Sequence, residues 1–596
     1  MKKVNSYIMF LVLSLVIFNS CDKDLNVPPQ NILQDDDLYS NESAVTAYFA
    51  TLYNDLPVED FNFSKNGFNT WADGGGFLHD LSDESITNQT DNKSSIGDGT
   101  WLQYWAYGSV RNVNDFIAKL PTSSFTDDKK KQWMGEARFI RAYYYFGMVK
   151  RYGGVPLITV VQNYTGNNLQ ELQVPRNTEK ELYDFVAAEL DSAANLLPDA
   201  GGQGADQLGK VNKYTALALK SRAMLYAASI AQYGTVQLNG LVGIPSAEAP
   251  KYWQAAYDAA KKVIDAGHYS LYNKNPDKTQ NFTALFLDAS SSENIFIKQF
   301  SYPKKTHSYD NWNLPYSVRG TAGYGSRTNP TLELAEQYEY IDGSDGKLQL
   351  NDASGNPKQY ASPTDLFRNK DPRFGATYIY PFADWKGTTI DIQAGIIDNG
   401  QVITSGRFDD LYNGKHIIGA NGIGGGGGEV SQTGFYIRKY LNSAYDRSKV
   451  APWTSAQAFI DMRYAEVLLN FAEAAIELHN VTDAKWALNQ LRDRAGIALL
   501  ADNQVTREKV RHERQVELAF ESHRYWDIRR WRIADKILNN SKTSALLPYL
   551  VLSNNSYIFK TSPVGFPKTF TTNLYYERVD PNEISKNPKL VQNPGY

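Results

Sequence analysis

The side chains in this chain that could do chemistry are aromatic rings with polar neighbours. One group lies within HSYDNWNLPYSVRGTAGYGS, residues 307–326, and comprises Tyr309, Asn311, Trp312, Asn313, Tyr316, Arg319 and Tyr324. A second group is Trp71 and Asp73, in a glycine-rich stretch that can present a ring, followed by Trp101. Flat rings stack on the apolar faces of sugars, and Asn, Asp and Arg side chains bond hydroxyl groups. These residues are therefore predicted to bind a ligand.

The same aromatic residues also have a structural interpretation. Trp101, Tyr104 and Trp105 stand at an expected helix start and fit a hydrophobic core equally well. Trp312 could be a core plug beneath its loop. The flanking Asn311 and Asn313, and Pro315, which stiffens the loop behind it, favour the ligand role instead. The chain is 13% aromatic, with 39 Tyr and 11 Trp, which suits both stacking surfaces and a helical core. The sequence alone leaves both roles open.

Signatures of catalysis are weak. The chain has no GxSxG, no HExxH and no Walker loop, and Gly422–Gly427 fits GxGxxG without the strand and helix of a nucleotide site. The seven histidines lack metal-ligand spacing. Asp83 and Glu84 are a candidate carboxylate pair for a glycosidase, although a structural role or a polar contact is the preferred interpretation. We expect no catalytic activity, no cofactor and no metal.

Composition is that of a large globular protein. Hydrophobic residues make up 42% and charged residues 21% of the 596 positions, which is ordinary for a soluble chain. The net charge of −4 argues against a nucleic-acid partner.

The N-terminus reads as a lipoprotein signal. Lys2 and Lys3 precede an apolar run over 7–18 that is too short to span a bilayer comfortably. Cys21 follows, and it is the only cysteine in the chain. We predict cleavage before Cys21 and lipidation of its thiol; the alternative is ordinary cleavage nearby, leaving a free thiol. Residues 21–40 then form a tether.

Hydrophobic periodicity predicts helices after the tether and again near the C-terminus. The expected helices are 42–53, 135–150, 178–197, 212–231, 253–266 and 463–478.

The stretch 511–531, RHERQVELAFESHRYWDIRRW, combines many charges with large apolar side chains. Val516, Ala519 and Phe520 would share one helical face. The acidic stripe of helix 463–478, which includes Glu473, could pair with these arginines within an antiparallel helix array. The preferred interpretation is a set of ion pairs that lock helices together, with a ligand site as the alternative.

Several segments carry a family resemblance. RYAEVLLNFAEA, LNQLRDRAG, ERQVELAFESHRYWDIRRW and NPKLVQNPGY, in this order, resemble the C-terminal signature of the SusD/RagB family of outer-membrane nutrient-binding lipoproteins. GEARFIRAYYYF and KYTALALKSRAMLYAA are similar to its N-terminal segments, and NPTLELAEQYEYIDG, DPRF and TGFYIRKYLN continue the match. Ser522 stands where the family usually has glycine.

The resemblance implies a mainly α fold, a superhelix of tetratricopeptide-like helix pairs with an irregular loop-rich lobe packed on it. The expected parts are a signal peptide (1–20), the lipidated tether (21–40), an N-terminal helical region (41–272) and a C-terminal region (273–596). The C-terminal region divides into the lobe (273–453), a helical part (454–535) and a tail (536–596).

The resemblance also implies a function. The implied protein is a surface-exposed outer-membrane lipoprotein that binds a nutrient glycan and acts as the lid of a SusC-like TonB-dependent transporter. A peptide-binding lid of the RagB type is the first alternative, and a glycan hydrolase is a weaker one. Specificity is expected in the least familiar pieces, 60–100, 301–327 and 384–433, because loops on a rigid scaffold carry function.

Overall fold

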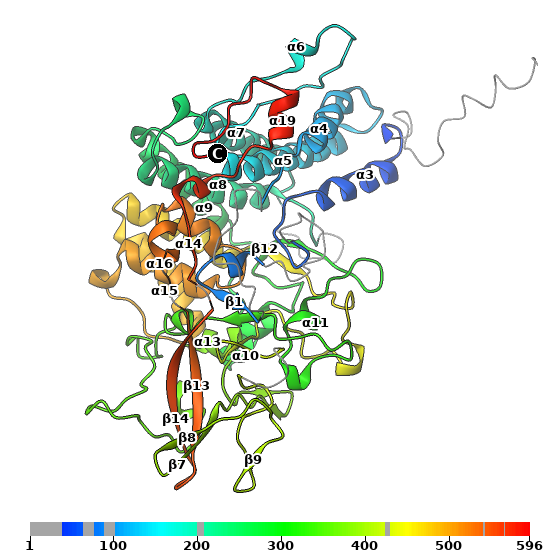
Figure 1. Ribbon diagram of the computed structural model, residues 1–596. Helices are drawn as coiled ribbons and strands as arrows, with labels where there is room; N and C mark the ends of the chain where they lie inside the picture. Colours follow the sequence, from blue (N-terminus) through cyan, green and yellow to red (C-terminus); the bar gives the residue numbers. More distant parts are fainter. Residues whose placement is uncertain are drawn as a thin grey trace, which may run out of the picture.

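The computed structural model describes residues 38–63, 77–88, 102–199, 208–423, 429–539, 541, 543–565 and 567–596. Packed helices form the upper part of the molecule, and a loop-rich lobe with short strands forms the lower part (Figure 1). The predicted fold class is confirmed. None of the helices within the described residues combines the length and hydrophobicity needed to cross a bilayer.

Helices pack in sequence order to make the upper part. They are α3 (Glu42–Asn54), α4 (Tyr107–Lys119), α5 (Asp127–Tyr152), α7 (Glu179–Leu196), α8 (Lys213–Tyr233), α9 (Ala249–Ala266), α14 (Tyr464–Glu477), α15 (Val481–Ala495) and α16 (Arg507–Glu517). Helix α5 packs on α4 and α7, α8 packs on α7 and α9, and α14 packs on α9, α15 and α16. Each helix thus buries its apolar stripe against the next, which produces the superhelix.

Local sequence sets the ends of these helices. The Thr126 side chain accepts the backbone N–H of Lys129 at the start of α5, and Gly153, at φ +72°, ends it. The Asn212 side chain caps α8 in the same way. Alanines such as Ala216 and Ala223 in α8 are fully buried, so that neighbouring helices can approach closely.

The lower lobe contains short helices and strands. They are α10 (Lys278–Leu285), β2 (Asn294–Lys298), α11 (Tyr309–Asn313), β3 (Thr328–Pro330), α12 (Leu332–Ala335), α13 (Pro372–Thr377), β4 (Tyr378–Ile379), β5 (Asp384–Trp385), β6 (Thr388–Thr389), β7 (Gly395–Asp398), β8 (Gln401–Ile403), β9 (Leu411–Tyr412), β10 (Lys415–His416) and β11 (Tyr436–Ile437).

Two strand pairings connect this lobe to other parts of the chain. The C-terminal tail returns as a long hairpin, β13 (Thr543–Val551) and β14 (Ser556–Val564), and forms a four-stranded sheet in the order β14-β13-β7-β8. Strand β12 (Phe459–Arg463) pairs with β2 and leads directly into α14. The lobe is therefore fixed to the helices by backbone hydrogen bonds as well as by side chains.

The charged stretch 511–531 is two helices joined by a turn. Helix α16 ends at Glu517, and α17 (Arg524–Arg530) begins after a turn in which Phe520 and Ser522 have φ values of +63° and +64°. The prediction that Val516, Ala519 and Phe520 share one helical face was wrong, because the chain leaves the helix before Ala519. The positive φ of Ser522 gives a physical reason for a glycine at this position.

The acidic residues of α14 and the arginines of this stretch do pair, as predicted. Glu473 is bound by Arg530, at 2.5 Å, and by the indole N–H of Trp531, at 2.7 Å. Arg514 donates to the side-chain oxygen of Asn470 at 2.7 Å. These groups are almost completely buried, so they lock helices together and offer no surface to a ligand.

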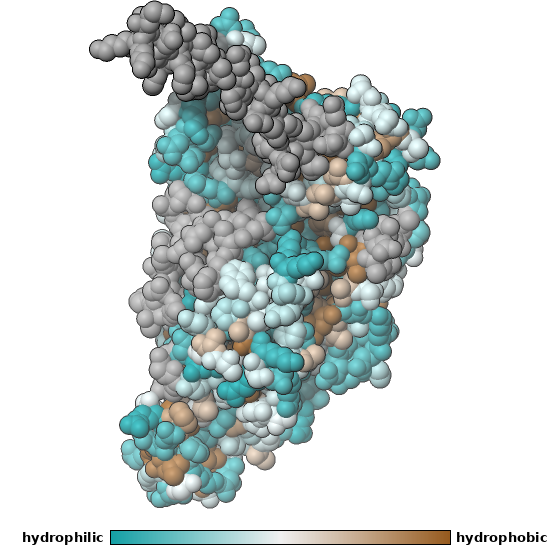
Figure 2. All heavy atoms as spheres, turned by 90° about the vertical axis from the view of Figure 1, so that its right-hand side faces the viewer, coloured by the Kyte–Doolittle hydropathy of each residue, from teal (hydrophilic) through white to brown (hydrophobic). Residues whose placement is uncertain are grey.

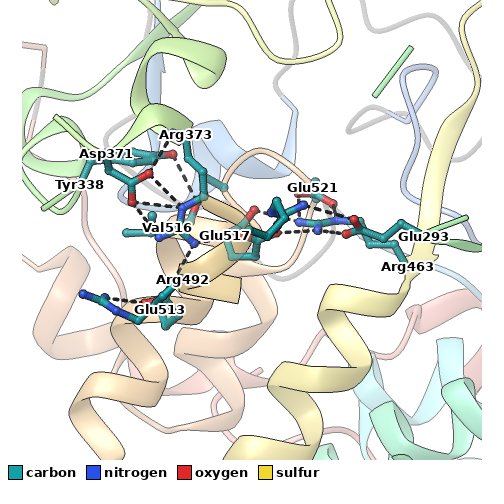
Figure 3. Close-up of polar contacts among 12 residues, drawn as sticks. Glu293, Tyr338, Asp371, Arg373, Arg463, Arg492, Glu513, Val516, Glu517 and Glu521 are labelled. Carbon is teal, nitrogen blue, oxygen red and sulfur yellow. Dashed lines mark hydrogen bonds and ion pairs between the residues drawn. The ribbon is translucent and has the colours of Figure 1, made fainter. Parts of the chain in front are cut away.

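A buried ionic network continues from these helices into the lobe (Figure 3). Glu517 of α16 pairs with Arg463 at 2.7 Å, with Arg373 at 2.9 Å and with Arg494. Arg463 also binds Glu293 at 2.6 Å and Glu521 at 2.6 Å. Because Arg373 lies on α13 and Arg463 lies at the end of β12, Glu517 joins the helical part to the lobe.

Charge compensation makes this burial tolerable. Burial alone would raise the pKa of Glu517, but the guanidinium groups of Arg494, Arg463 and Arg373 outweigh it and hold the pKa well below its usual range. Removal of one partner leaves uncompensated charges in a site that water does not reach.

We predict that Glu517→Gln lowers stability by roughly 3–5 kcal/mol, because three arginines lose their shared carboxylate. The matched control is Asp265→Asn on α9, whose pair with Lys261 is exposed (47% and 59% for the two side chains) and is worth less than about 1 kcal/mol. Thermal melting of both variants checks this. Equal melting temperatures for the two variants would contradict the structural role of Glu517.

Candidate functional site

The segment 309–324 begins with helix α11, on the right-hand side of the lobe in Figure 1. This side of the molecule faces the viewer in Figure 2. The segment consists of helix α11 and a 3-10 turn at Tyr316–Val318. Backbone hydrogen bonds from Ser326 to Leu314 (2.9 Å) and from Arg327 to Trp312 (2.8 Å) fold the segment back on itself. It is an ordered turn structure, although its sequence has no period.

Asp310 anchors α11 to the interior of the lobe. Its carboxylate accepts hydrogen bonds from Ser455 Oγ (2.7 Å), Gln457 Nε2 (2.8 Å) and the backbone N–H of Asn442 (2.7 Å). Burial raises the pKa of this carboxyl group, and the three hydrogen bonds act against that rise. These hydrogen bonds therefore fix helix α11, where the candidate site begins, to the interior of the lobe.

Three predicted ligand residues point into the protein. Tyr309 is 3% exposed, and Asn311 and Asn313 are fully buried. The Tyr309 hydroxyl donates to the carbonyl of Lys439 at 3.0 Å, and the Asn313 amide bonds Tyr309 and Thr328. The expectation that both asparagines flank the ring at the surface was wrong, because a helical turn directs positions on either side of Trp312 inward.

The remaining predicted residues of this segment lie nearer the surface. The rings of Trp312 and Tyr324 contact each other with centroids 4.8 Å apart, and Tyr324 is 44% exposed. The guanidinium of Arg319 lies 4.1 Å from the centre of the Tyr316 ring. The segment thus carries two aromatic contacts, one of them with a cation. We call these four residues the platform, and their partly exposed rings can stack on the apolar face of a ligand.

A hollow of about 250 Å³ borders the 3-10 turn of this segment through Ser317 and Val318. Its lining combines apolar, hydroxyl, amide and cationic side chains, namely Leu314, Ser317, Val318, Trp385, Lys386, Thr388, Asn442, Tyr445, Arg447 and Val450. Figure 2 shows that the described residues on the α11 side of the molecule are largely hydrophilic, with pale areas of intermediate hydropathy.

Several residues at this site were not predicted from the sequence. Trp385, Lys386 and Thr388 belong to a stretch expected to carry specificity, but no motif singled them out. Tyr445 and Arg447 had no signal. Trp453 is 39% exposed, and its backbone N–H donates to Ser308 Oγ at 2.9 Å, next to α11; its aromatic character was the available clue.

Trp71, Asp73, Trp101 and Cys21 lie outside the described residues. Tyr104 and Trp105 are described and are partly buried near the start of α4, where Trp105 contacts Tyr107 and Tyr152. The structural interpretation holds for this pair.

Two other hollows lie in the helical part. One, of about 390 Å³, is bordered by α3, the first half of α5 and β2, and includes the buried pair Tyr53–Glu136 at 2.8 Å. The other, of about 480 Å³, lies near the C-terminus, beside Arg532, Tyr575 and Tyr576. Both are larger than the hollow in the lobe, but no residue of the segment 309–324 lines either of them.

The carboxylate pair Asp83–Glu84 is occupied by structural contacts. Asp83 binds the guanidinium of Arg524 at 2.8 Å. Glu84 is 1% exposed and accepts the backbone N–H of Phe520 at 3.0 Å. Within the described residues, no group of three or more His, Cys, Asp or Glu side chains is arranged to hold a metal ion.

The fold is a set of packed helix pairs with a loop-rich lobe, and the lobe carries the aromatic platform. Comparison with known families shows which family has this fold. Residues 292–596 match the SusD family, and residues 25–225 match a family described as starch-binding and associating with the outer membrane. The chain belongs to the SusD family, which confirms the resemblance seen in the sequence.

Individual relatives are distant but cover nearly the whole chain. SusD-like proteins of Formosa agariphila are 22% and 24% identical, over 90% and 89% of this chain and 94% and 91% of their own lengths. A crystal structure of a SusD-like protein from Bacteroides fragilis, 24% identical, matches with a TM-score of 0.68 over 94% of this chain and 99% of its own. A laminarin-binding SusD-like protein, 18% identical, matches with a TM-score of 0.60 over 94% of this chain and 100% of its own.

Glu84 generates a pH prediction. Burial raises the pKa of its carboxyl group to about 8 from the ordinary 4.5. Between these values the folded protein keeps a proton that the unfolded chain releases, so the free energy of unfolding falls as pH rises. Between pH 5 and 8.5 we expect the free energy of unfolding of the wild type to fall by roughly a few kcal/mol relative to that of Glu84→Gln, whose side chain is neutral throughout.

Thermal melting of the wild type and of Glu84→Gln across this pH range measures the effect. The difference between their melting temperatures should be largest near pH 5 in favour of the wild type and should shrink or reverse at pH 8.5. A difference that is constant with pH would show that Glu84 is ionised in the folded state.

Proposed function

We propose that this protein is a cell-surface lipoprotein that binds a nutrient glycan and delivers it to a TonB-dependent outer-membrane transporter, for which it acts as the lid. The observation that carries the binding role is the partly exposed platform of Trp312, Tyr316, Arg319 and Tyr324. Membership of the SusD family supports the transporter partner and the outer-membrane location. Cys21 would supply the lipid anchor.

Binding without catalysis is the activity that this site favours. Rings can bury the C–H face of a sugar, and Ser317, Thr388 and Asn442 bring hydroxyl and amide groups to the hollow. A hydrolase would need two carboxylates beside the ligand. Asp310, on α11, is buried and engaged in hydrogen bonds, and Asp83 and Glu84 are buried or paired with Arg524.

A peptide ligand remains the second candidate, and one feature favours it. Strand β8 (Gln401–Ile403) is an edge of the four-stranded sheet, and Val402 is 47% exposed. Exposed edge strands can pair with an extended peptide. This edge lies at the lower end of the lobe, away from α11 (Figure 1), so the two candidates use different surfaces.

We predict that Trp312→Ala weakens oligosaccharide binding about tenfold while the protein stays folded. A ring covering ~60 Å² of a sugar contributes about 1.5 kcal/mol at ~25 cal/mol per Å², which corresponds to this change in affinity. Isothermal titration calorimetry and thermal melting of the same variant provide the measurement.

The matched control is Trp486→Ala. Trp486 is 41% exposed on α15, remote in sequence from the platform, and its loss should leave glycan affinity unchanged. A large fall in the melting temperature of Trp312→Ala would identify Trp312 as a core residue. Unchanged affinity for every glycan that the wild type binds would exclude the platform.

The anchor has its own test. Cys21→Ala should leave the protein unlipidated and move it out of the membrane fraction, because a single acylated cysteine is the proposed attachment. Detergent-phase partitioning of cells expressing each form measures this. If the alanine variant still partitions fully into the detergent phase, the attachment lies elsewhere.

A further inference from the structure

We propose that the hollow beside the aromatic platform binds the anionic substituent of an acidic sugar, a carboxylate or a sulfate ester. This inference rests on the proposed glycan-binding function and specifies the ligand class. It depends on Lys386 and Arg447, which line the hollow, and on Arg319, whose carbonyl accepts the Arg447 Nε–H.

The three cations have no carboxylate partner. Within the described part of the chain, no Asp or Glu oxygen lies within 4.0 Å of any of these charged groups, the distance that defines the ion pairs elsewhere. The Lys386 ammonium donates one hydrogen bond, to the carbonyl of Tyr445 at 2.7 Å. The Arg447 Nε–H donates to the carbonyl of Arg319 at 2.7 Å.

Donor capacity is left over at both residues. An ammonium has three N–H donors and a guanidinium has five, whereas Lys386 and Arg447 each use one in these contacts. Arg319 lies with its guanidinium against the Tyr316 ring at 4.1 Å, an arrangement that leaves the edge of the group available for hydrogen bonds. Arginine and lysine donors of this kind form charge-assisted hydrogen bonds with carboxylate and sulfate oxygens.

The nearest acidic side chains have other partners. Asp310 is buried beneath α11 and accepts three hydrogen bonds from the interior. Asp446 accepts the backbone N–H and the hydroxyl of Ser448, both at 2.8 Å. Asp384 accepts the backbone N–H of Gly387 at 3.2 Å. Hydrogen bonds from neutral donors do not cancel the charge of a carboxylate, and Asp446 also interacts electrostatically with Lys386. The positive charge is therefore an excess, because the three cations outnumber the two exposed carboxylates Asp384 and Asp446.

The hairpin β5–β6 presents Lys386 at its tip. Lys386 and Gly387 form its two-residue turn with φ values of +54° and +78°. Such a turn favours Asn or Asp followed by Gly, because a lysine is strained at positive φ. The preceding residue, Trp385, points inward and is 5% exposed.

The rest of the lining fits a sugar ring. Leu314, Val318 and Val450 give an apolar wall, while Ser317, Thr388 and Asn442 give hydroxyl and amide groups. The segment that carries Leu314 and Ser317 also carries the platform residues Trp312 and Tyr316. The proposal therefore places the acidic sugar in the hollow and the neighbouring units of the glycan on this segment.

The test compares oligosaccharides of equal length that are neutral, uronate-containing or sulfated, at low and high salt, by isothermal titration calorimetry. We expect the acidic ligands to bind at least tenfold tighter than the neutral ones, with an affinity that falls as salt rises. The separate uronate and sulfate series show which anion the hollow accepts.

Two variants and a control localise the effect. Lys386→Asn removes the charge and suits the turn, so folding is preserved, and Arg447→Gln removes the second charge from an exposed position. Each should reduce affinity for the acidic ligands about tenfold and leave neutral ligands unaffected. Lys358→Gln, an exposed lysine elsewhere in the lobe, should change nothing.

The outcomes separate the two proposals. Equal affinity for neutral and acidic ligands, or unchanged binding in both variants, would overturn the acidic-sugar inference and leave the glycan-binding function standing. Equal losses in Lys358→Gln would show non-specific electrostatic attraction and would also overturn it. Absence of binding to every oligosaccharide in the series would overturn both proposals.

Discussion

The buried carboxylate of Glu517 is the interaction on which the rest of the structure depends. It lies at the end of α16 and accepts hydrogen bonds from arginines that come from the end of β12, from α13 and from α15. A guanidinium that is taken out of water requires a matched partner, so these elements have one low-energy arrangement. The lobe is thereby held in a fixed position on the helices, and its surface segments can be presented to a ligand without reordering.

Much of the fold could be predicted because its causes are local. Apolar periodicity and caps such as Thr126 and Gly153 locate the helices. The pairing of Glu473 with Arg530 follows from stripes of opposite charge on nearby segments. The break at Phe520 was not predicted, because a positive φ in a large residue depends on surrounding packing. The pairing of the C-terminal hairpin with β7 was not predicted because β7 lies far away in sequence.

The sequence predicted which segment carries the candidate site, but not which side chains of that segment lie at the surface. Residue types identified Trp312 and Tyr324 as potential stacking rings, and the structure brings these rings together. The inward direction of Asn311 and Asn313 depends on α11, a helix too short to produce a periodic pattern. The cations Lys386 and Arg447 come from hairpins and turns distant in sequence, so only the folded lobe shows that they line one hollow.

The central claim is that a rigid lobe presents one composite ligand surface, with the aromatic platform and the cationic hollow side by side. A crystal structure of the mature protein with its tightest-binding oligosaccharide tests this most directly. The account predicts a sugar ring against Trp312 and Tyr324 and an acidic group within hydrogen-bonding distance of Lys386 and Arg447. A ligand bound instead in the hollow beside Arg532 and Tyr576, or along the edge of β8, would contradict it.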